Sequence, residues 1–255
     1  MSGDTREKQS SPPDLERMVH SQVAEEIRAA AMDRRMTEDL ALALLVRRDL
    51  RGEVLDELSK NVTVMKHRKV IVALVCHPRT PRYVSMPITR RLYTFELLKI
   101  AVLPPVPADV KMIAEEAIIN RLETISSGER LTLAKSGSTR IAAALLADAE
   151  PRVIDAALLN SRLTEPFVVK ALMREDARQH LVHAVCRHPK WSLRKEIQIA
   201  LLKSPHTPLP RAIYIAEQLS SNALREILAT ARLSEDLKSF LIDEVERRKI
   251  QNAFH

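Results

Sequence analysis

Two stretches of the sequence decide its fold: VIVALVCHPRTP at residues 70–81 and IQIALLKSPHTP at residues 197–208. They lie 127 positions apart, share Ala-Leu in their apolar part and end alike in Pro-x-Thr-Pro. Taken alone, the first is a short apolar run of the kind that a buried strand also shows. The second follows three charged residues, 194–196, and lacks strict alternation of apolar and polar residues, which is typical of a helix. We therefore predict a buried helix in both stretches.

The similarity extends well beyond these stretches. The same shift of 127 aligns residues 27–118 with residues 154–245 without a gap. Identical residues include Thr37-Glu38 with Thr164-Glu165, Arg47-x-Asp49-x-Arg51 with Arg174-x-Asp176-x-Arg178, and Leu92, Leu97 and Ile100 with Leu219, Leu224 and Ile227. A chance match of two Ala/Leu-rich helical stretches is the alternative, but matched Pro, Thr, Arg and Asp are not residues that merely fill helices. We interpret the chain as an internal duplication with its seam near residues 126–138.

Composition excludes several fold classes. The chain has 255 residues, 45% of them hydrophobic, with only 3% aromatic residues and four glycines. Four glycines cannot supply the turns of a many-stranded barrel, and the abundance of Ala, Leu, Arg and Glu favours helices. Cap and proline signals predict helices at 38–48, 53–60, 67–76, 81–92, 95–102 and 108–122, with counterparts 127 residues later. In particular, Thr80-Pro81 and Thr207-Pro208 predict a threonine N-cap followed by proline in the first turn.

These helices are too short to bury an apolar face alone, so they must stack on their neighbours. We predict an all-α fold, an α-solenoid (superhelix) of short stacked helices built from two tandem copies of a unit of about 127 residues. The expected organisation is a disordered tail at 1–13, a first half at 14–128 and a second half at 129–255, forming one continuous solenoid.

The Pro-x-Thr-Pro turns at residues 77–81 and 204–208, each leading into an apolar helix, carry a family resemblance. The pattern resembles bacterial α-solenoid repeat proteins of the HEAT-like and leucine-rich-repeat-variant type. The resemblance implies a binding scaffold and transfers no catalytic residue to this chain. Pro87 within a predicted helix and the proline-rich loop at 104–107 depart from a strict repeat.

Charge and hydropathy suggest where the protein works. The two cysteines, Cys76 and Cys186, predict reduced thiols, and the longest apolar stretches, 70–76 and 100–108, are too short to span a membrane. We expect a cytoplasmic protein without membrane contact. Lys and Arg number 40 against 33 Asp and Glu, and the net charge of +7 favours acidic partners.

A basic segment occupies the same phase of both halves and is the first candidate site. Its members with the strongest claim to bind an anion or a partner are Lys66, Arg68, Lys69, Arg79 and Arg82 in the first half and Lys190, Arg194 and Lys195 in the second. Equivalent loops of a solenoid line one edge, so these charges are candidates for a stripe that follows phosphate groups. The alternative is an ordinary solvated face with cations near helix C-termini.

The doubled triplet forms the second candidate site. In Arg47-x-Asp49-x-Arg51 and Arg174-x-Asp176-x-Arg178, an aspartate lies between two guanidinium groups. Such an aspartate can orient both as forks for a carboxylate or phosphate. The alternative is an ion-pair cluster that orients one helix on the next. Retention in both copies fits either interpretation.

Other chemistry finds less support in the sequence. His180-x-x-His183-x-x-Cys186 has helical metal-ligand spacing, but the equivalent residues Glu53, Asp56 and Ser59 suggest an exposed polar face. A glycosylase of the HEAT-like kind would need aromatic and acidic groups, for which Trp191 and Asp176 are the nearest candidates. Nucleophile-elbow, metalloprotease and dinucleotide motifs are absent, so we predict no enzyme, no cofactor and no metal.

The functional prediction is a non-enzymatic scaffold that binds a protein partner on the surface of the solenoid. Binding of nucleic acid or another polyanion through the basic stripe is the alternative. Few aromatic residues accompany the stripe, which disfavours single-strand binding by base stacking.

Overall fold

The structure, a computed structural model, describes residues 13–230, 233 and 235–253. Within these residues every regular element is a helix and none is a strand, which confirms the predicted all-α class. The ambiguous apolar run at 70–75 lies inside a helix, as its polar counterpart predicts. The expected disordered tail lies outside the described residues, apart from Pro13 at the start of the first helix. None of the helices in the described part combines the length and the apolar character needed to cross a membrane.

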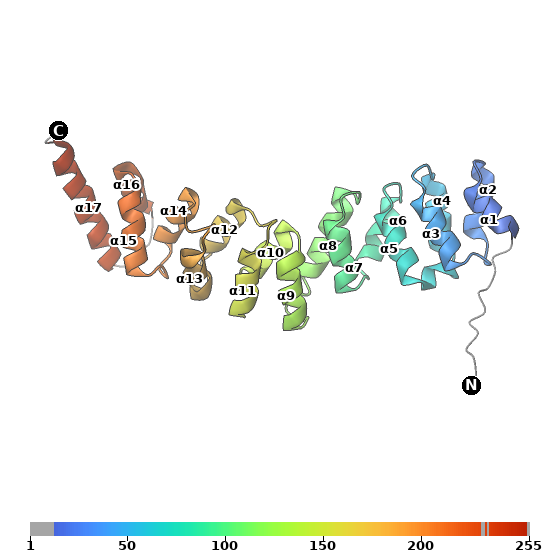
Figure 1. Cartoon of the computed structure of the whole chain (residues 1–255), viewed down its shortest axis with the longest axis horizontal. Helices are drawn as coiled ribbons and strands as arrows, with labels where there is room; N and C mark the ends of the chain where they lie inside the picture. The colour runs from blue at the N-terminus through green and yellow to red at the C-terminus, as the bar shows by residue number, and fades with distance from the viewer. Residues whose placement is uncertain (1–12, 231–232, 234, 254–255) are drawn as a thin grey trace. The chain divides into compact units, whose positions relative to one another are not determined.

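The chain divides into two compact units, Met1–Asn120 and Arg121–His255, whereas the sequence predicts halves that meet at 128 and 129. The helices of unit 1 are α1 (Pro13–His20), α2 (Ala24–Met32), α3 (Glu38–Val46), α4 (Gly52–Lys60), the 3-10 turn η1 (Val64–Lys66), α5 (Arg68–Cys76), α6 (Arg82–Thr89), α7 (Thr94–Val102) and α8 (Ala108–Ile119) (Figure 1).

The helices of unit 2 are α9 (Ser127–Ser136), α10 (Thr139–Leu145), α11 (Pro151–Leu158), α12 (Glu165–Leu172), α13 (Gln179–Arg187), α14 (Lys195–Lys203), α15 (Leu209–Gln218), α16 (Ser221–Thr230) and α17 (Glu235–Ala253).

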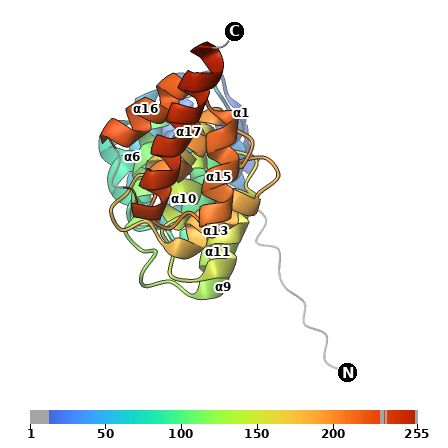
Figure 2. The ribbon, with the colours of Figure 1, turned by 90° about the vertical axis from the view of Figure 1, so that its left-hand side faces the viewer.

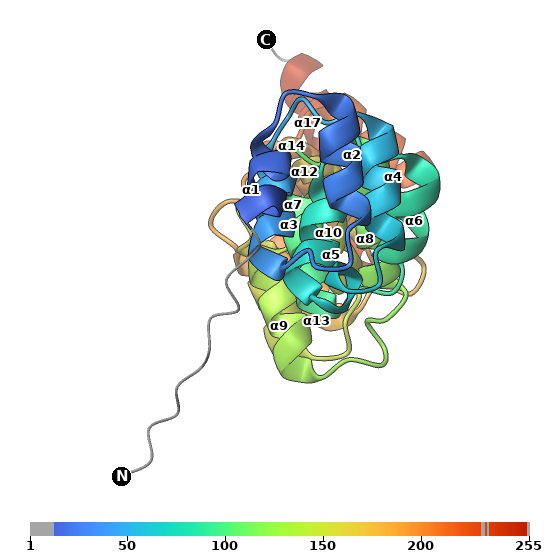
Figure 3. The same cartoon turned by 90° about the vertical axis from the view of Figure 1, so that its right-hand side faces the viewer.

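Helices of unit 1 alternate between two rows. One row is α1, α3, α5 and α7, in which each helix contacts the next; in the other, α2 contacts α4 and α6 contacts α8. Figure 3 shows the rows side by side, with α2, α4 and α6 on the right. Buried aliphatic side chains fill the space between the rows, among them Leu44, Leu55 and Leu74, each fully buried. Neither row can exclude water from its apolar side without the other.

Unit 2 has the same kind of arrangement. Its rows are α10, α12, α14 and α16 on one side, and on the other α9 with α11 and α13, and α15 with α17. The C-terminal helix α17 packs against both α15 and α16, as Figure 2 shows. Trp191 is 1% exposed and is the largest fully buried side chain described. Each unit therefore has its own core.

The helix starts follow the predicted 127-residue period. In unit 1, α2 to α8 begin at 24, 38, 52, 68, 82, 94 and 108; in unit 2, α11 to α17 begin at 151, 165, 179, 195, 209, 221 and 235, each 127 positions later. The predicted helices agree with these to within one residue at their starts. In unit 1 three helix ends differ from the prediction: α3 ends at Val46 rather than at 48, α6 at Thr89 rather than at 92, and α8 at Ile119 rather than at 122. The end of α6 follows the in-helix Pro87, whose ring nitrogen has no hydrogen to donate.

The predicted threonine caps at the Pro-x-Thr-Pro turns are wrong. In both turns the N-cap position is the proline, Pro81 or Pro208, and the helix begins one residue later. The threonine hydroxyl points backward instead: Thr80 donates to the carbonyl of Leu74 and Thr207 to that of Leu201, both at 2.6 Å. Each hydroxyl is a second donor to a carbonyl in the last turn of the preceding helix, which also accepts the backbone amide of the C-cap residue, His77 or Ser204.

In unit 1, polar side chains that follow α4 and α5 connect each of these helices to the one two places earlier. Asn61, after α4, donates its amide to the carbonyls of Ala31 and Asp33 at the end of α2, both at 2.9 Å. His77, after α5, lies with Nε2 2.8 Å from the carbonyl oxygen of Arg47, after α3. These bonds satisfy carbonyls at helix C-termini and fix the spacing within each row.

Candidate functional site

The arginine triplet of unit 1 is part of this structural bonding. Arg47 is 14% exposed and grips Asp49 with two bonds, at 3.1 and 2.7 Å. Its remaining terminal nitrogen donates to the carbonyls of Val19 and Ser21, at the C-terminal end of α1, at 2.8 and 2.7 Å. Hydrogen bonding to this guanidinium lowers the pKa of Asp49. Arg51 is exposed and begins α4 without a described side-chain partner. In this triplet Arg47 is therefore bonded within the protein and Arg51 points outward, so the two guanidinium groups do not form a joint site for an anion.

The triplet of unit 2 has the same ion pair as the triplet of unit 1, but its first arginine makes no described bond to a backbone carbonyl. Arg174 grips Asp176 with two bonds of 2.8 Å, and this bonding lowers the pKa of Asp176. The side chain of Arg174 is nevertheless 51% exposed, and no carbonyl bond from it is described. The turn after α10 is reached instead by Arg178, which donates to the carbonyl of Ala147 at 3.1 Å.

The basic residues of unit 1 divide into inward and outward groups. Arg68 pairs with Glu96 and stacks 4.3 Å from the ring centroid of Tyr93, and Arg82 pairs with Asp109. Arg79 donates to the carbonyls of Asp49 and Leu50, at 3.1 and 3.3 Å. By contrast, Lys66 is exposed and Lys69 is 80% exposed, 4.0 Å from a carboxylate oxygen of Glu38. Two lysines of the predicted stripe therefore remain available to an outside anion.

In unit 2 the predicted basic residues are less constrained. Lys190 lies 3.9 Å above the ring of Trp191, whose indole donates to the carbonyl of Leu158 at 2.9 Å. Arg194 and Lys195 are exposed at the start of α14, with no side-chain partner in the part of the chain described. Trp191 is thus a core residue, unsuited to stack on a substrate base.

The histidine and cysteine pattern does not assemble a metal centre. Nε2 of His180 lies 3.1 Å from a carboxylate oxygen of Asp155, while Cys186 is buried. Within residues 13–230 and 235–253, no group of three His, Cys, Asp or Glu side chains is placed to hold a metal ion. Burial raises the pKa of both Cys76 and Cys186, which disfavours the reactive thiolate.

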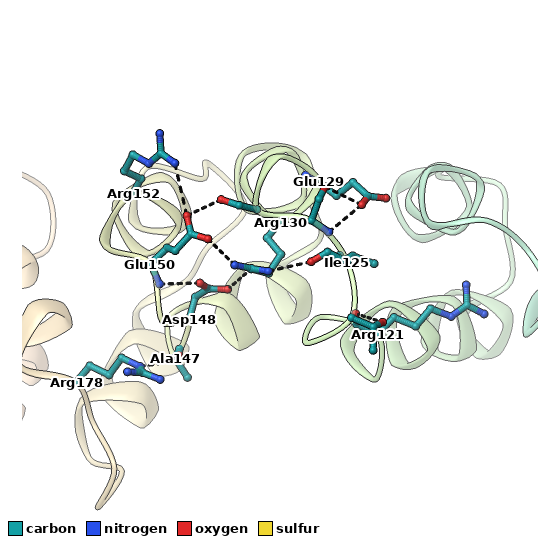
Figure 4. A network of polar contacts seen from close by, with 12 residues as sticks. Arg121, Ile125, Glu129, Arg130, Ala147, Asp148, Glu150, Arg152 and Arg178 are labelled. Atoms are coloured by element: carbon teal, nitrogen blue, oxygen red, sulfur yellow. Dashed lines mark hydrogen bonds and ion pairs between the residues drawn. The ribbon is translucent and has the colours of Figure 1, made fainter.

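A polar cluster that the sequence did not single out lies at the start of unit 2 (Figure 4). Arg130 of α9 lies with Nε 2.8 Å from Asp148, donates to Glu150 at 2.7 Å and to the carbonyl of Ile125 at 2.9 Å. Asp148 is only 6% exposed and Arg130 16%. A hydrogen bond from Ser127 is the main cause of the lowered pKa of Glu150. Because α9 has no counterpart 127 residues earlier, the repeat could not reveal this cluster.

A cavity with a volume of about 790 Å³ also lies in unit 2, at the C-terminal ends of α12, α14 and α16. Apolar lining comes from Leu172, Met173, Ala177 and Pro205. Its charged and polar lining is Arg174, Glu175, Lys203, Ser204, His206 and Thr230. Arg174 is the one residue of the predicted site that lines this cavity. His206 is the counterpart of Arg79, which in unit 1 bonds to backbone carbonyls.

Comparison of the chain with protein-family models, with curated proteins and with solved structures gives no match in any of the three.

Proposed function

We propose that the chain is a non-enzymatic α-solenoid, built from two tandem copies of one helical unit, that binds a protein partner on its surface. The equal spacing of seven helix starts supports the duplication, since unrelated helical stretches have no reason to keep one period. The matched bonds Thr80 to Leu74 and Thr207 to Leu201 support it further. The two-row arrangement within each unit is the kind of packing that a solenoid uses.

Exposed apolar side chains at equivalent positions are the observation that favours a protein partner. Val46, after which α3 ends, is 77% exposed, and its counterpart Met173, after α12, is 51% exposed. Met32 and its counterpart Leu159 are 55% and 73% exposed. Single exposed apolar residues are ordinary, but their recurrence in both units is not explained by the core. A protein partner would bury them, which a polyanion would not.

The polyanion alternative has less support from the geometry. Four arginines of the predicted stripe and triplet, Arg47, Arg68, Arg79 and Arg82, are engaged within unit 1. Of the basic residues predicted to bind an anion, those that remain exposed without a close ion pair are chiefly Arg51, Lys66, Lys69, Arg194 and Lys195.

Affinity capture with the full chain tests the proposal. We expect a stoichiometric protein from extract of the source cells that remains bound in high salt and after nuclease treatment, because apolar contacts are little screened. Val46→Asp with Met173→Asp should release it, while Met112→Asp, at an exposed apolar residue whose counterpart is the polar Ser239, should not.

Retention that falls steeply with salt, follows nucleic acid and is lost in a quadruple charge reversal at Arg68, Lys69, Arg194 and Lys195 would favour the polyanion alternative. Recovery of no stoichiometric protein would count against the scaffold.

A further inference from the structure

We infer that the cavity at the ends of α12, α14 and α16 binds an acidic segment of the partner protein that alternates carboxylate and apolar side chains. This inference rests on the proposed function and identifies the chemistry of the partner at one place. Equivalent positions of the two units differ in the side chains that fill them.

In unit 1 the equivalent position is occupied by the protein's own arginines. Arg47 and Arg79 turn their guanidinium groups onto backbone carbonyls of Val19, Ser21, Asp49 and Leu50. In unit 2, Arg174 bonds only to Asp176 among the described residues, and Arg79 is replaced by His206. The imidazole of His206 is shorter than an arginine side chain, is exposed, and has no described side-chain partner. The space that arginine fills in unit 1 is therefore left open in unit 2.

The lining of the cavity contains a cation that no carboxylate of the described residues neutralises. Arg174 and Lys203 carry fixed positive charges, and Lys203 has no ion pair in the described part of unit 2. Negative charge in the lining comes from Glu175, and Asp176 lies beside Arg174 and is already paired with it. Lys203 is thus the cation of the lining that can take a new carboxylate, and the second terminal nitrogen of Arg174 makes no described bond.

The apolar lining distinguishes a peptide from a small free anion. Three of the lining residues are apolar and differ in exposure: Leu172 is buried, Met173 is 51% exposed and Pro205 is exposed. A volume of about 790 Å³ is within the range of pockets that enclose small ligands and far exceeds the size of one phosphate. A carboxylate on Lys203 with a neighbouring aliphatic side chain on Met173 uses both kinds of lining.

Methyl NMR of the full chain, labelled at methionine methyl groups, tests this inference, with the Met173 signal assigned from a Met173→Leu variant. The probe is the capped peptide Glu-Leu-Glu-Leu-Glu, with the capped Lys-Leu-Lys-Leu-Lys peptide and inorganic phosphate as controls. We expect a saturable shift of the Met173 signal with the acidic peptide only. Lys203→Glu should weaken binding by about tenfold or more, since one charge-assisted contact becomes a repulsion.

Two variants complete the test. Lys170→Glu, at an exposed lysine of α12 outside the cavity, should leave the affinity for the acidic peptide unchanged. His206→Arg should weaken it by letting the guanidinium bond to the carbonyls of Asp176 and Ala177, as Arg79 does in unit 1. Thermal melting confirms that each variant folds.

The inference is overturned by any of three results: no saturable shift, an equal response to the lysine peptide, or displacement of the acidic peptide by phosphate at equal concentration. The last would identify a small-anion site. None of them affects the capture experiment with Val46 and Met173, so the proposed function can stand or fail separately.

Discussion

Unit 1 and unit 2 begin seven helices in the same register, yet they hold the ends of those helices with different side chains. In unit 1, Asn61 accepts a bond from the Thr63 amide and donates to two carbonyls of the α2 end. In unit 2 its counterpart His188 keeps only the acceptor role, toward the Lys190 amide. Trp191 takes over the donor role, to the carbonyl of Leu158, which is the counterpart of the Ala31 carbonyl.

The carbonyls at the helix C-termini need hydrogen-bond donors in both units, but different side chains supply those donors. Helix C-terminal carbonyls must find donors in both units, because a buried carbonyl without one costs free energy. Which residue supplies the donor can change, provided the bond is replaced. At Arg174 and His206 the carbonyl bonds made by Arg47 and Arg79 in unit 1 are not replaced, and a cavity lies there instead.

The largest expected difference between the units concerns the arginine of each triplet. Arg47→Met should lower the free energy of unfolding by about 2–3 kcal/mol, because it removes the donors of the Val19 and Ser21 carbonyls. Arg174→Met should change it by less than about 0.5 kcal/mol, as for an exposed ion pair. Urea denaturation of the two full-length variants measures both values. Equal losses would show that the two arginines do the same work.

The next largest effect concerns Trp191 and His188, which in unit 2 share the donor and acceptor roles that Asn61 has in unit 1. Trp191→Phe should lower the free energy of unfolding by about 1–2 kcal/mol, because the Leu158 carbonyl loses its indole donor. Adding His188→Asn restores the unit 1 residue at that position and should recover part of the loss, by offering an amide donor to the same carbonyl. Denaturation of the single and double variants tests this. A double variant less stable than Trp191→Phe alone would contradict the exchange of roles.

A smaller effect should be equal in the two units. Thr80→Val and Thr207→Val each remove one hydroxyl donor from an equivalent carbonyl, and each should cost about 1 kcal/mol of unfolding free energy. Thr132→Val, which removes an exposed bond to the Gly128 carbonyl, is the matched control and should cost little. A large inequality between the first two would show that the turns are not equivalent in strength.

Much of the fold could be predicted from the sequence, because period and composition determine which segments become helices. The polar counterpart at residues 197–208 was enough to assign the apolar run at 70–75 to a helix. The direction of individual polar side chains could not be predicted. Thr80-Pro81 looks like an N-cap in sequence, and only the packed turn shows the hydroxyl turned back to the Leu74 carbonyl.

The candidate site was predictable in part, for the same reason. Sequence identified Arg47 and Arg174 as equivalent, but their different burial depends on which carbonyls lie within reach. The cavity beside Arg174 depends on His206 being shorter than Arg79, a difference that matters only after the helices are packed. The Arg130 cluster belongs to α9, which lies outside the residues that the shift of 127 aligns, so no sequence pattern pointed to it.

Acid should affect the two units through the histidines at their helix ends. In unit 1, His77 is 4% exposed; Nε2–H donates to the Arg47 carbonyl and Nδ1 accepts from the Arg79 amide. Burial lowers the pKa of His77, and the nearby Arg48 and Arg79 lower it further. In unit 2, burial and Lys190 lower the pKa of His188, whose Nδ1 is likewise an acceptor.

Because the unfolded histidine binds a proton at higher pH than the folded one, the unfolding free energy should fall as the pH drops below about 6.5. Carboxylates with lowered pKa, such as Asp49, do not titrate between about pH 7 and 5, so this window isolates the histidines. His77→Ser, which places the unit 2 residue Ser204 in unit 1, should reduce the pH dependence even though it removes one bond. His188→Asn should reduce the remainder, and urea denaturation at pH 7, 6 and 5 measures both. An unchanged pH dependence in the double variant would show that neither histidine must stay neutral for its turn to hold.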